Sequence, residues 1–208
     1  MPPTIPPTKD RILDAAEGLF AQHGFDGASL REVTRAADAN LAAVHYHFGS
    51  KAGLFEAVFH RRLGTVNAER LALLERLESP RKRPGVAEIL HAFLAPVFRL
   101  AAADGPEAPT VARLLARAHS SAEVHAPSVR EVLQPVEQRF GTALARALPH
   151  VAERELRRRL RFVLGSMCGV LGELEAAGEA SEEREDPLGQ LVAFAAAGVA
   201  AEALPPGA

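Results

Sequence analysis

Cysteine is nearly absent from this chain, because Cys168 is the only one among its 208 residues. A single thiol excludes an intrachain disulfide, a CxxC redox pair and a metal cluster built on thiolates. A lone cysteine in an apolar helical segment is usually an inert packing residue rather than a redox switch. We therefore expect no disulfide scaffold, no cofactor and a reducing, cytoplasmic environment.

Long apolar runs are also missing. The longest, Leu191 to Ala201, is far shorter than the roughly 20 residues that a membrane-spanning helix needs. The opening MPPTIPPTKD has prolines where a secretory signal has an apolar run. We expect neither export nor a membrane anchor. The chain is 48% hydrophobic with ordinary charge content, which is enough to build a core.

An excess of positive charge, the simplest sign of a nucleic-acid-binding protein, is absent as well. The formal net charge is −2, and the first 62 residues carry seven Lys or Arg against seven Asp or Glu. DNA binding therefore cannot be inferred from bulk charge, and any such function must rest on where the positive side chains lie.

Enzyme motifs are not found either. The sequence has no HExxH, no cluster of His and Asp ligands and no Gly-rich phosphate loop. His45 and His47 are two residues apart and face different sides of a helix, so we expect no zinc site. An all-α lyase or hydrolase is the alternative class, and we predict that the chain is not an enzyme.

What the sequence does contain is helical periodicity, with no convincing strand alternation anywhere. The predicted helices run from Lys9 to the HGFDG segment, briefly after Ser29, and over Leu41–Phe48, Lys51 to about Leu77, Val86–Ala103, Pro109–Ser120, Ser128–Leu148, Glu153–Ala177 and Pro187–Ala203. This pattern predicts an all-α fold of about nine helices.

Capping residues sharpen the first of these boundaries. Ser29 and Glu32 form an S-x-x-E capping box, Asn40 is placed to cap the next helix, and Ser50 to cap the one after. Two short helices joined by a tight turn beside an amphipathic helix make a helix-turn-helix. We predict a helix-turn-helix domain over residues 1–50 and a larger helical domain over residues 51–208.

The third helix would be the one that enters a DNA groove. Val44 and Phe48 lie four apart and face the core, and Leu41 is ambiguous between core and groove. Ala42 and Ala43 lie on the other side and are small enough for close approach to the roughly 12 Å wide major groove.

Other side chains of this helix, and Lys51 at the start of the next, are suited to DNA contacts. His45 and Tyr46 are placed to meet base edges or a thymine methyl group. His47 and Lys51 are placed to reach phosphates, and Lys51 also begins a helix, where free amides favour an anion.

The segments TKDRILDAAEGLFAQHG and FDGASLREVTRAADANLAAVHYHFGSKAGLFEAVF resemble the DNA-binding domain of the TetR (tetracycline repressor) family. The resemblance covers Thr8 to Phe59, and YHFGSKAGLF is its most specific part. It implies a repressor whose amino-terminal domain binds a palindromic operator as a homodimer and whose carboxy-terminal domain binds a small-molecule effector.

Carried over by position, the resemblance implies DNA contacts from the second helix, the third helix and the start of the fourth. The residues are Ser29, Arg31, Thr34, Ala42, Ala43, His45, Tyr46, His47 and Lys51. The family usually has Gly where this chain has Asp38. Because Asp tolerates the left-handed conformation at modest cost, we expect the turn to be kept.

The last two predicted helices carry apolar stripes that require burial. The residues are Leu156, Leu160, Val163, Leu164, Met167, Val170, Leu171 and Leu174, then Leu188, Leu191, Val192, Ala195 and Val199. Their simplest role is core, whereas the resemblance implies a four-helix dimer interface with Val192 and Val199 as interface positions. We expect Arg157, Arg158, Arg159 and Arg161 to form a solvated helix face.

Pro96 and Pro135 fall inside helical patterns and should kink their helices. Kinked helices beside aromatic residues favour an apolar cavity, although a close-packed core is an equal alternative. The candidate effector-binding residues are Phe93, Phe98, Leu115, His119, Val132, Phe140, Phe162 and Met167, with His119 as the polar group.

The segment REVLQPVEQRFGTALARALPHVAERELRRRLRFVLGSM is similar to TetR-like regulators of fatty-acid or aromatic metabolism. This similarity implies a fatty acyl compound or an aromatic acid as effector. A DNA-binding regulator without any effector is the alternative.

Overall fold

The computed structural model describes residues 6–78, 83–102, 127–177 and 186–202. These ranges contain α1 (Thr8–Gly27), α2 (Leu30–Ala36), α3 (Leu41–Phe48), α4 (Lys51–Leu77), α5 (Val86–Ala101), α7 (Pro127–Ala147), α8 (Glu153–Ala177) and α9 (Pro187–Ala200), and no strand. The all-α prediction is confirmed. The helix predicted over Pro109–Ser120 lies outside the described residues. None of the helices in the described ranges is long and apolar enough to cross a membrane.

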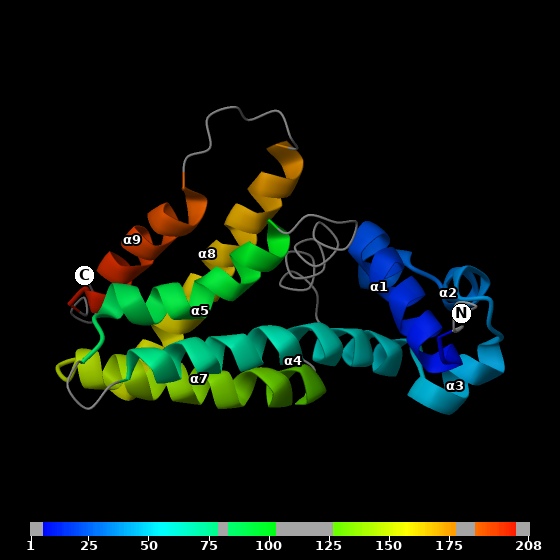
Figure 1. The fold of residues 1–208 in the computed structure, drawn as a ribbon, viewed down its shortest axis with the longest axis horizontal. Coiled ribbons are helices and arrows are strands. Elements are labelled where there is room, and N and C mark those ends of the chain that lie inside the picture. The colour runs from blue at the N-terminus through cyan, green and yellow to red at the C-terminus, as the bar shows by residue number, and fades with distance from the viewer. Residues whose placement is uncertain (1–5, 79–82, 103–126, 178–185, 203–208) are drawn as a thin grey trace, which may run out of the picture.

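The helices form two groups joined by one long helix (Figure 1). The reading head consists of α1, α2 and α3 at one end. The helical body consists of α5, α7, α8 and α9 at the other end. Helix α4 begins in the head and continues along the body, where it packs against α5 and α7.

The reading head has its own apolar interior, which explains how three short helices hold together. Ile12 of α1, Val44 of α3 and Phe55 of α4 are buried in it. The Phe55 ring meets Phe20 edge to face at 5.1 Å and Phe25 at 5.2 Å between ring centres. Aromatic pairs in this geometry add to the stabilisation from burial, so the end of α1 is fixed to the start of α4.

Two residues with positive φ shape the turns of the head. Gly24 has φ 72° inside α1, so the helix breaks there before a last turn to Gly27. Asp38 has φ 46° between α2 and α3, and its carbonyl oxygen accepts a 3.1 Å hydrogen bond from Arg11 Nη2. The expectation that Asp38 adopts the left-handed conformation is confirmed, and Arg11 helps to hold the turn.

Helix α4 buries a stripe that is only partly apolar. Leu63, Val66 and Leu74 are buried, and so are Asn67 and Arg70. These positions follow a helix's three- and four-residue spacing, so the polar pair lies on the same face as the leucines. The middle of the body therefore contains polar groups that need partners.

The outward faces of α8 and α9 differ from the expected ones. Val192 and Val199 are buried within the protomer, where α9 packs against α5. The expectation that they lie at a dimer interface is therefore wrong. The outward positions are those of Phe162 on α8, which is 63% exposed, and Phe194 on α9, which is 71% exposed.

The arginine run on α8 is only partly a solvated face. Arg157, Arg158 and Arg161 are exposed as expected, whereas Arg159 is buried. Its Nη1 donates to the carbonyl oxygens of Val199 at 2.7 Å and Ala201 at 2.6 Å. Arg159 therefore caps the carboxy-terminal end of α9, where the helix has carbonyl groups without intrahelical donors.

Candidate functional site

Ser29 is the N-cap residue of α2, and its polar groups form hydrogen bonds with the first turn of that helix. Its hydroxyl donates to Glu32 Oε2 at 2.6 Å and accepts the Glu32 backbone N–H at 3.2 Å, while its own backbone N–H donates to Glu32 Oε2 at 2.9 Å. The hydrogen bonds from Ser29 lower the pKa of Glu32, so its carboxylate stays ionised. The capping box is confirmed. While it is formed, the Ser29 hydroxyl has no proton to donate to a phosphate.

Arg31 and Thr34 follow on α2. Arg31 is exposed, whereas Thr34 is half-buried and donates its hydroxyl to the Arg31 carbonyl oxygen at 3.0 Å. Arg31 and the likewise exposed Arg35 are therefore the cations that α2 presents to a partner.

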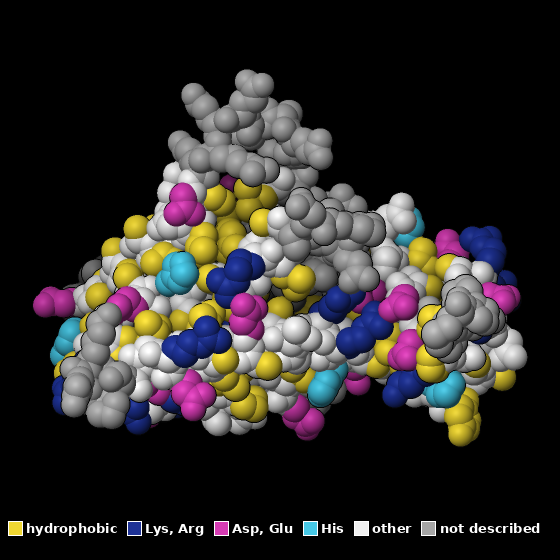
Figure 2. Space-filling model, in the orientation of Figure 1, with side chains coloured by type: hydrophobic (Ala, Val, Ile, Leu, Met, Phe, Trp, Pro, Cys, Tyr) yellow, Lys and Arg dark blue, Asp and Glu magenta, His cyan; other side chains and the backbone are white. Residues whose placement is uncertain are grey.

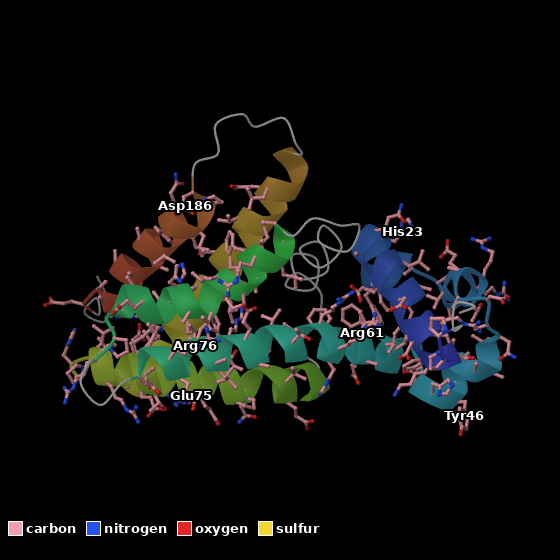
Figure 3. All side chains as sticks on the ribbon, viewed as in Figure 1. His23, Tyr46, Arg61, Glu75, Arg76 and Asp186 are labelled. Carbon is pink, nitrogen blue, oxygen red and sulfur yellow. The ribbon has the colours of Figure 1, made fainter. Side chains whose placement is uncertain are left out.

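Helix α3 is held rigidly and presents small and aromatic groups outward. Asn40 Oδ1 accepts the Ala43 N–H at 2.8 Å, as the predicted cap requires. Val44 is fully buried, Ala42 is exposed, and Tyr46 is 85% exposed and projects away from the head (Figure 3). The helix therefore combines a fixed backbone with a projecting phenol ring.

The imidazole of His45 turns back onto its own helix. Its Nδ1 lies 2.9 Å from the Gly49 carbonyl oxygen. A carbonyl only accepts, so Nδ1 carries the proton. In the neutral ring Nε2 is then an acceptor, which suits the amino group of adenine or cytosine and not a phosphate.

Lys51 joins the start of α4 to the end of α1. Its Nζ donates to the Asp26 carbonyl oxygen at 3.3 Å and lies 4.7 Å from the centre of the Phe25 ring. The ammonium has three N–H donors and stays at the surface, so it can keep this contact and also bind a phosphate. His47 is exposed, with its ring edge-on to Tyr46 at 5.0 Å.

Glu17 is a buried group of the head that sequence analysis missed. It is 3% exposed on α1 and accepts from two arginines of α4: Arg61 Nη2 at 2.7 Å and Arg62 Nε at 2.6 Å. Arg61 also donates to Asp14 at 2.7 Å, and it lies where α1 meets α4 (Figure 3). These ion pairs fix the orientation of the head on α4.

The structure brings together some of the predicted effector-binding residues. Phe93, Phe98, Phe140 and Met167 are buried in the body, and Val132 packs at the edge of its core. The Phe93 and Phe140 rings meet edge to face at 5.0 Å.

Three other predicted effector-binding residues are not part of this group. Phe162 lies on the outer side of α8, because the neighbouring Val163 occupies the buried stripe. Leu115 and His119 lie outside the described residues.

A polar cluster on α4, not found from the sequence, lies among the buried aromatic residues. Asn67 Nδ2 donates to the Val132 carbonyl oxygen at 3.0 Å, and Arg70 Nε donates to the Phe93 carbonyl oxygen at 2.7 Å. Each acceptor lies three residues before a proline, Pro135 or Pro96. It is therefore next in sequence to the carbonyl, four residues before the proline, that loses its helix hydrogen bond. The signal for it in the sequence was the apolar stripe of α4, whose spacing passes through both residues.

The thiol of Cys168 is partly buried on α8. Burial raises the pKa of Cys168 to about 11, so the thiol stays protonated and unreactive at neutral pH. Among the described residues, no three His, Cys, Asp or Glu side chains gather in a way that could hold a metal ion.

Comparisons with known proteins match both ends of the chain. Residues 12–58 match the family described as Bacterial regulatory proteins, tetR family. Residues 91–198, which are more than half of the chain, match the family described as Tetracyclin repressor-like, C-terminal domain.

Curated relatives match the reading head only. YttP of Bacillus subtilis, a probable HTH-type transcriptional regulator, is 49% identical over 49 residues, which are 24% of this chain and 24% of YttP. IcaR of Staphylococcus aureus, an HTH-type negative transcriptional regulator of the biofilm operon icaADBC, is 38% identical over 48 residues. That match covers 23% of this chain and 26% of IcaR, so the similarity spans about a quarter of each relative.

Solved structures share the whole fold. The fatty acid degradation regulator FadR from Bacillus halodurans superposes with a TM-score of 0.68 at 18% identity, covering 95% of this chain and 97% of FadR. GusR of Salmonella enterica superposes with a TM-score of 0.59 at 21% identity, covering 94% and 97%. With both parts matched in sequence and the fold shared throughout, the chain belongs to the TetR family of bacterial regulatory proteins.

Proposed function

We propose that the chain is a transcriptional repressor that binds a palindromic operator as a homodimer and is released by a small, largely apolar effector. The observation that carries this proposal is the outward face of α3, where Tyr46 projects away from the rest of the head into solvent (Figure 3). Tyrosines held on a rigid element are typical of binding surfaces. We assign residues 1–50 to DNA binding and residues 51–208 to effector binding and dimerisation.

In this proposal α3 reads bases and its neighbours bind the phosphate backbone. Ala42 lets the helix approach the floor of the major groove, and Tyr46 and His45 Nε2 contact base edges. Arg31 of α2, His47 of α3 and Lys51 of α4 contact phosphates, and these contacts fix the position of the helix without reading sequence.

The dimer is supported by the outer faces of α8 and α9. Phe162 and Phe194 are the most exposed large apolar side chains of the described body, and Leu174 is also exposed. Figure 2 shows hydrophobic side chains gathered over these helices. The same surface on a second protomer would complete a two-fold interface.

The effector is proposed to bind among Phe93, Phe140 and Met167, where the proline-containing helices α5 and α7 meet α4. Its proposed class is a fatty acyl compound or an aromatic acid. A regulator without an effector is the second candidate, and the edge-to-face contact of Phe93 with Phe140 favours it because side chains already occupy this space.

A gel-shift assay tests DNA binding. The full chain should retard DNA from upstream of its own gene and leave an equal length of its coding sequence unbound. The affinity for upstream DNA should fall steeply with salt, because several phosphate contacts release counterions. Equal retardation of both fragments at every salt concentration would reject operator recognition.

The same assay tests release. Long-chain acyl-CoA, free fatty acids and aromatic acids are added to the retarded complex. Release by one class supports the repressor with an effector, whereas release by none supports the second candidate.

Sedimentation tests the dimer. Phe194→Asp should produce monomers at micromolar concentration, because it places a charge in the apolar interface. His91→Asp, at an exposed position of α5, is the control and should remain dimeric. A wild-type monomer would reject the assembly.

A further inference from the structure

Arg70 is a buried cation in the middle of the helical body. Its side chain is 1% exposed. The guanidinium donates from Nε to the Phe93 carbonyl oxygen at 2.7 Å, from Nη1 to Asn67 Oδ1 at 3.1 Å and from Nη2 to Met167 Sδ at 3.9 Å. All three acceptors are uncharged.

No carboxylate of the described residues neutralises this charge. The guanidinium carbon lies 4.2 Å from the centre of the Phe93 ring, which offers only the partial negative charge of an aromatic face. Burial lowers the pKa of Arg70 to about 10, so the side chain is still protonated at neutral pH. A charge buried without a counterion is costly, and folded proteins usually pair it.

The hydrogen bonds alone do not explain why this residue is an arginine. The Phe93 carbonyl oxygen, three residues before Pro96, accepts a hydrogen bond from the Arg70 side chain. The equivalent carbonyl beside Pro135, that of Val132, obtains its donor from the neutral amide of Asn67. A neutral side chain therefore donates to one of these carbonyls, while a full positive charge donates to the other.

The guanidinium also has donors to spare. Of its five N–H groups, three are used within the described residues, and one of those meets only a thioether. Thioether sulfur is a weak acceptor on a flexible side chain, so Met167 is readily displaced from Nη2. A planar carboxylate matches a guanidinium with two parallel hydrogen bonds, and the charged pair is stronger than the neutral contacts it replaces.

We infer that Arg70 anchors the carboxylate of a monocarboxylic acid whose apolar remainder packs against Phe93, Phe140 and Met167. This inference rests on the proposed function and narrows its effector to free acids. A coenzyme A ester lacks the carboxylate and carries several phosphate charges, which are too costly to bury in this apolar setting.

Matched acids and alcohols test the inference on the wild-type full chain, in the absence of DNA. Decanoate and phenylbutyrate are compared with decanol and phenylbutanol by thermal unfolding and by calorimetric titration. Ligands that bind only the folded state raise the melting temperature with concentration. At least one acid should do so, and its alcohol should bind roughly 30-fold more weakly or worse, because the alcohol cannot pair with the buried charge.

Variants separate the charge from the packing. Arg70→Met should lose the preference for the acid, and Arg70→Lys should keep part of it, since lysine keeps the charge but not the planar fork. Arg99→Met removes a half-exposed arginine of α5 and is the control; it should bind the acid as wild type does. If Arg70→Met does not fold, the inference is tested by Arg70→Lys and by the comparison of acid with alcohol on the wild type.

Three results would overturn the inference: no acid binds, acid and alcohol bind equally, or folded Arg70→Met keeps the preference. The gel-shift assay without ligand reports separately on the proposed function. Loss of operator binding by wild type would reject the repressor, whereas acid binding at Arg70 is measured without DNA and is judged on its own.

Discussion

The reading head and the helical body each bury a charged side chain, but they treat it differently. In the head, Glu17 of α1 is enclosed between Arg61 and Arg62, so its charge is compensated by the protein itself. In the body, Arg70 meets a carbonyl oxygen, an amide oxygen and a thioether, and no described carboxylate. The head's buried charge holds two helices together, whereas the body's is left for something else to neutralise.

The largest effect should come from breaking the compensated pair. Glu17→Leu leaves Arg61 and Arg62 without their shared carboxylate and should lower the free energy of unfolding by about 3 kcal/mol, as for other buried pairs that lose one partner. Urea denaturation measures it. The control is Glu69→Leu, which removes the half-exposed pair with Arg99 and should cost less than about 1 kcal/mol. Equal losses would show that burial of Glu17 has no special weight.

A second test asks whether exposed residues of the head, in contrast to its buried ones, bind the operator. Tyr46→Ala should weaken operator binding by about 1–3 kcal/mol and relax sequence preference, while leaving stability unchanged. Lys51→Ala is the comparison, and it should weaken binding to all sequences and reduce the salt slope by about 1. If Lys51→Ala changed base preference and kept the salt slope, the two roles would have to be exchanged.

Removing the uncompensated charge of Arg70 should lower the free energy of unfolding by less than Glu17→Leu does. Arg70→Met leaves the Phe93 carbonyl and Asn67 without a donor, but it also removes a buried charge that has no counterion. The two effects oppose each other, so the free energy of unfolding should fall by only about 1 kcal/mol. Urea denaturation beside Glu17→Leu measures the difference. A loss as large as that of Glu17→Leu would mean that Arg70 is needed mainly for folding.

The smallest change in the free energy of unfolding is expected for a partly exposed ion pair. It joins Glu78, at the carboxy-terminal end of α4, to Arg139 of α7. Hydrogen bonding from Arg139 lowers the pKa of Glu78 below its ordinary value. The pair therefore stabilises the fold above the unfolded carboxyl pKa of about 4.3, and this contribution is lost as the pH falls through the lower folded-state pKa. Glu78→Gln should cost at most about 1 kcal/mol at neutral pH and nothing in acid.

A pH series of urea denaturation measures this loss. Glu153→Gln, at an exposed pair within α8, is the control and should change the free energy of unfolding at neutral pH by less than Glu78→Gln does. A loss for Glu78→Gln that persists in acid would point to packing instead of charge.

The helix starts and the turn of the head could be predicted from the sequence because the residues that fix them are near neighbours. Ser29 and Glu32, Asn40 with Ala43, and Ser50 with Gly53 are each three residues apart, and all three caps form as predicted. The left-handed turn at Asp38 is likewise a property of one residue. A bond between near neighbours is fixed by the helix start itself, so pattern and structure agree.

The contacts that the sequence did not predict join residues distant in sequence, in the head as well as in the body. Arg61 meets Glu17 over 44 residues, Arg70 meets the Phe93 carbonyl over 23, and Arg159 meets the Val199 carbonyl over 40. A charged residue in a helical pattern is usually solvated, and only tertiary packing decides otherwise. The same holds for Phe162, whose outward direction depends on which side of α8 the body covers.

The length of α4 has a mechanical consequence. It runs without interruption for 27 residues from Lys51 to Leu77, and at 1.5 Å per residue it is about 40 Å long. By simple trigonometry, a tilt of about 5° at the body end displaces the other end by about 3.5 Å, close to the 3.4 Å rise per base pair of DNA. If an effector bound in the body tilts α4 by this amount, the head moves by about one base-pair step along the double helix.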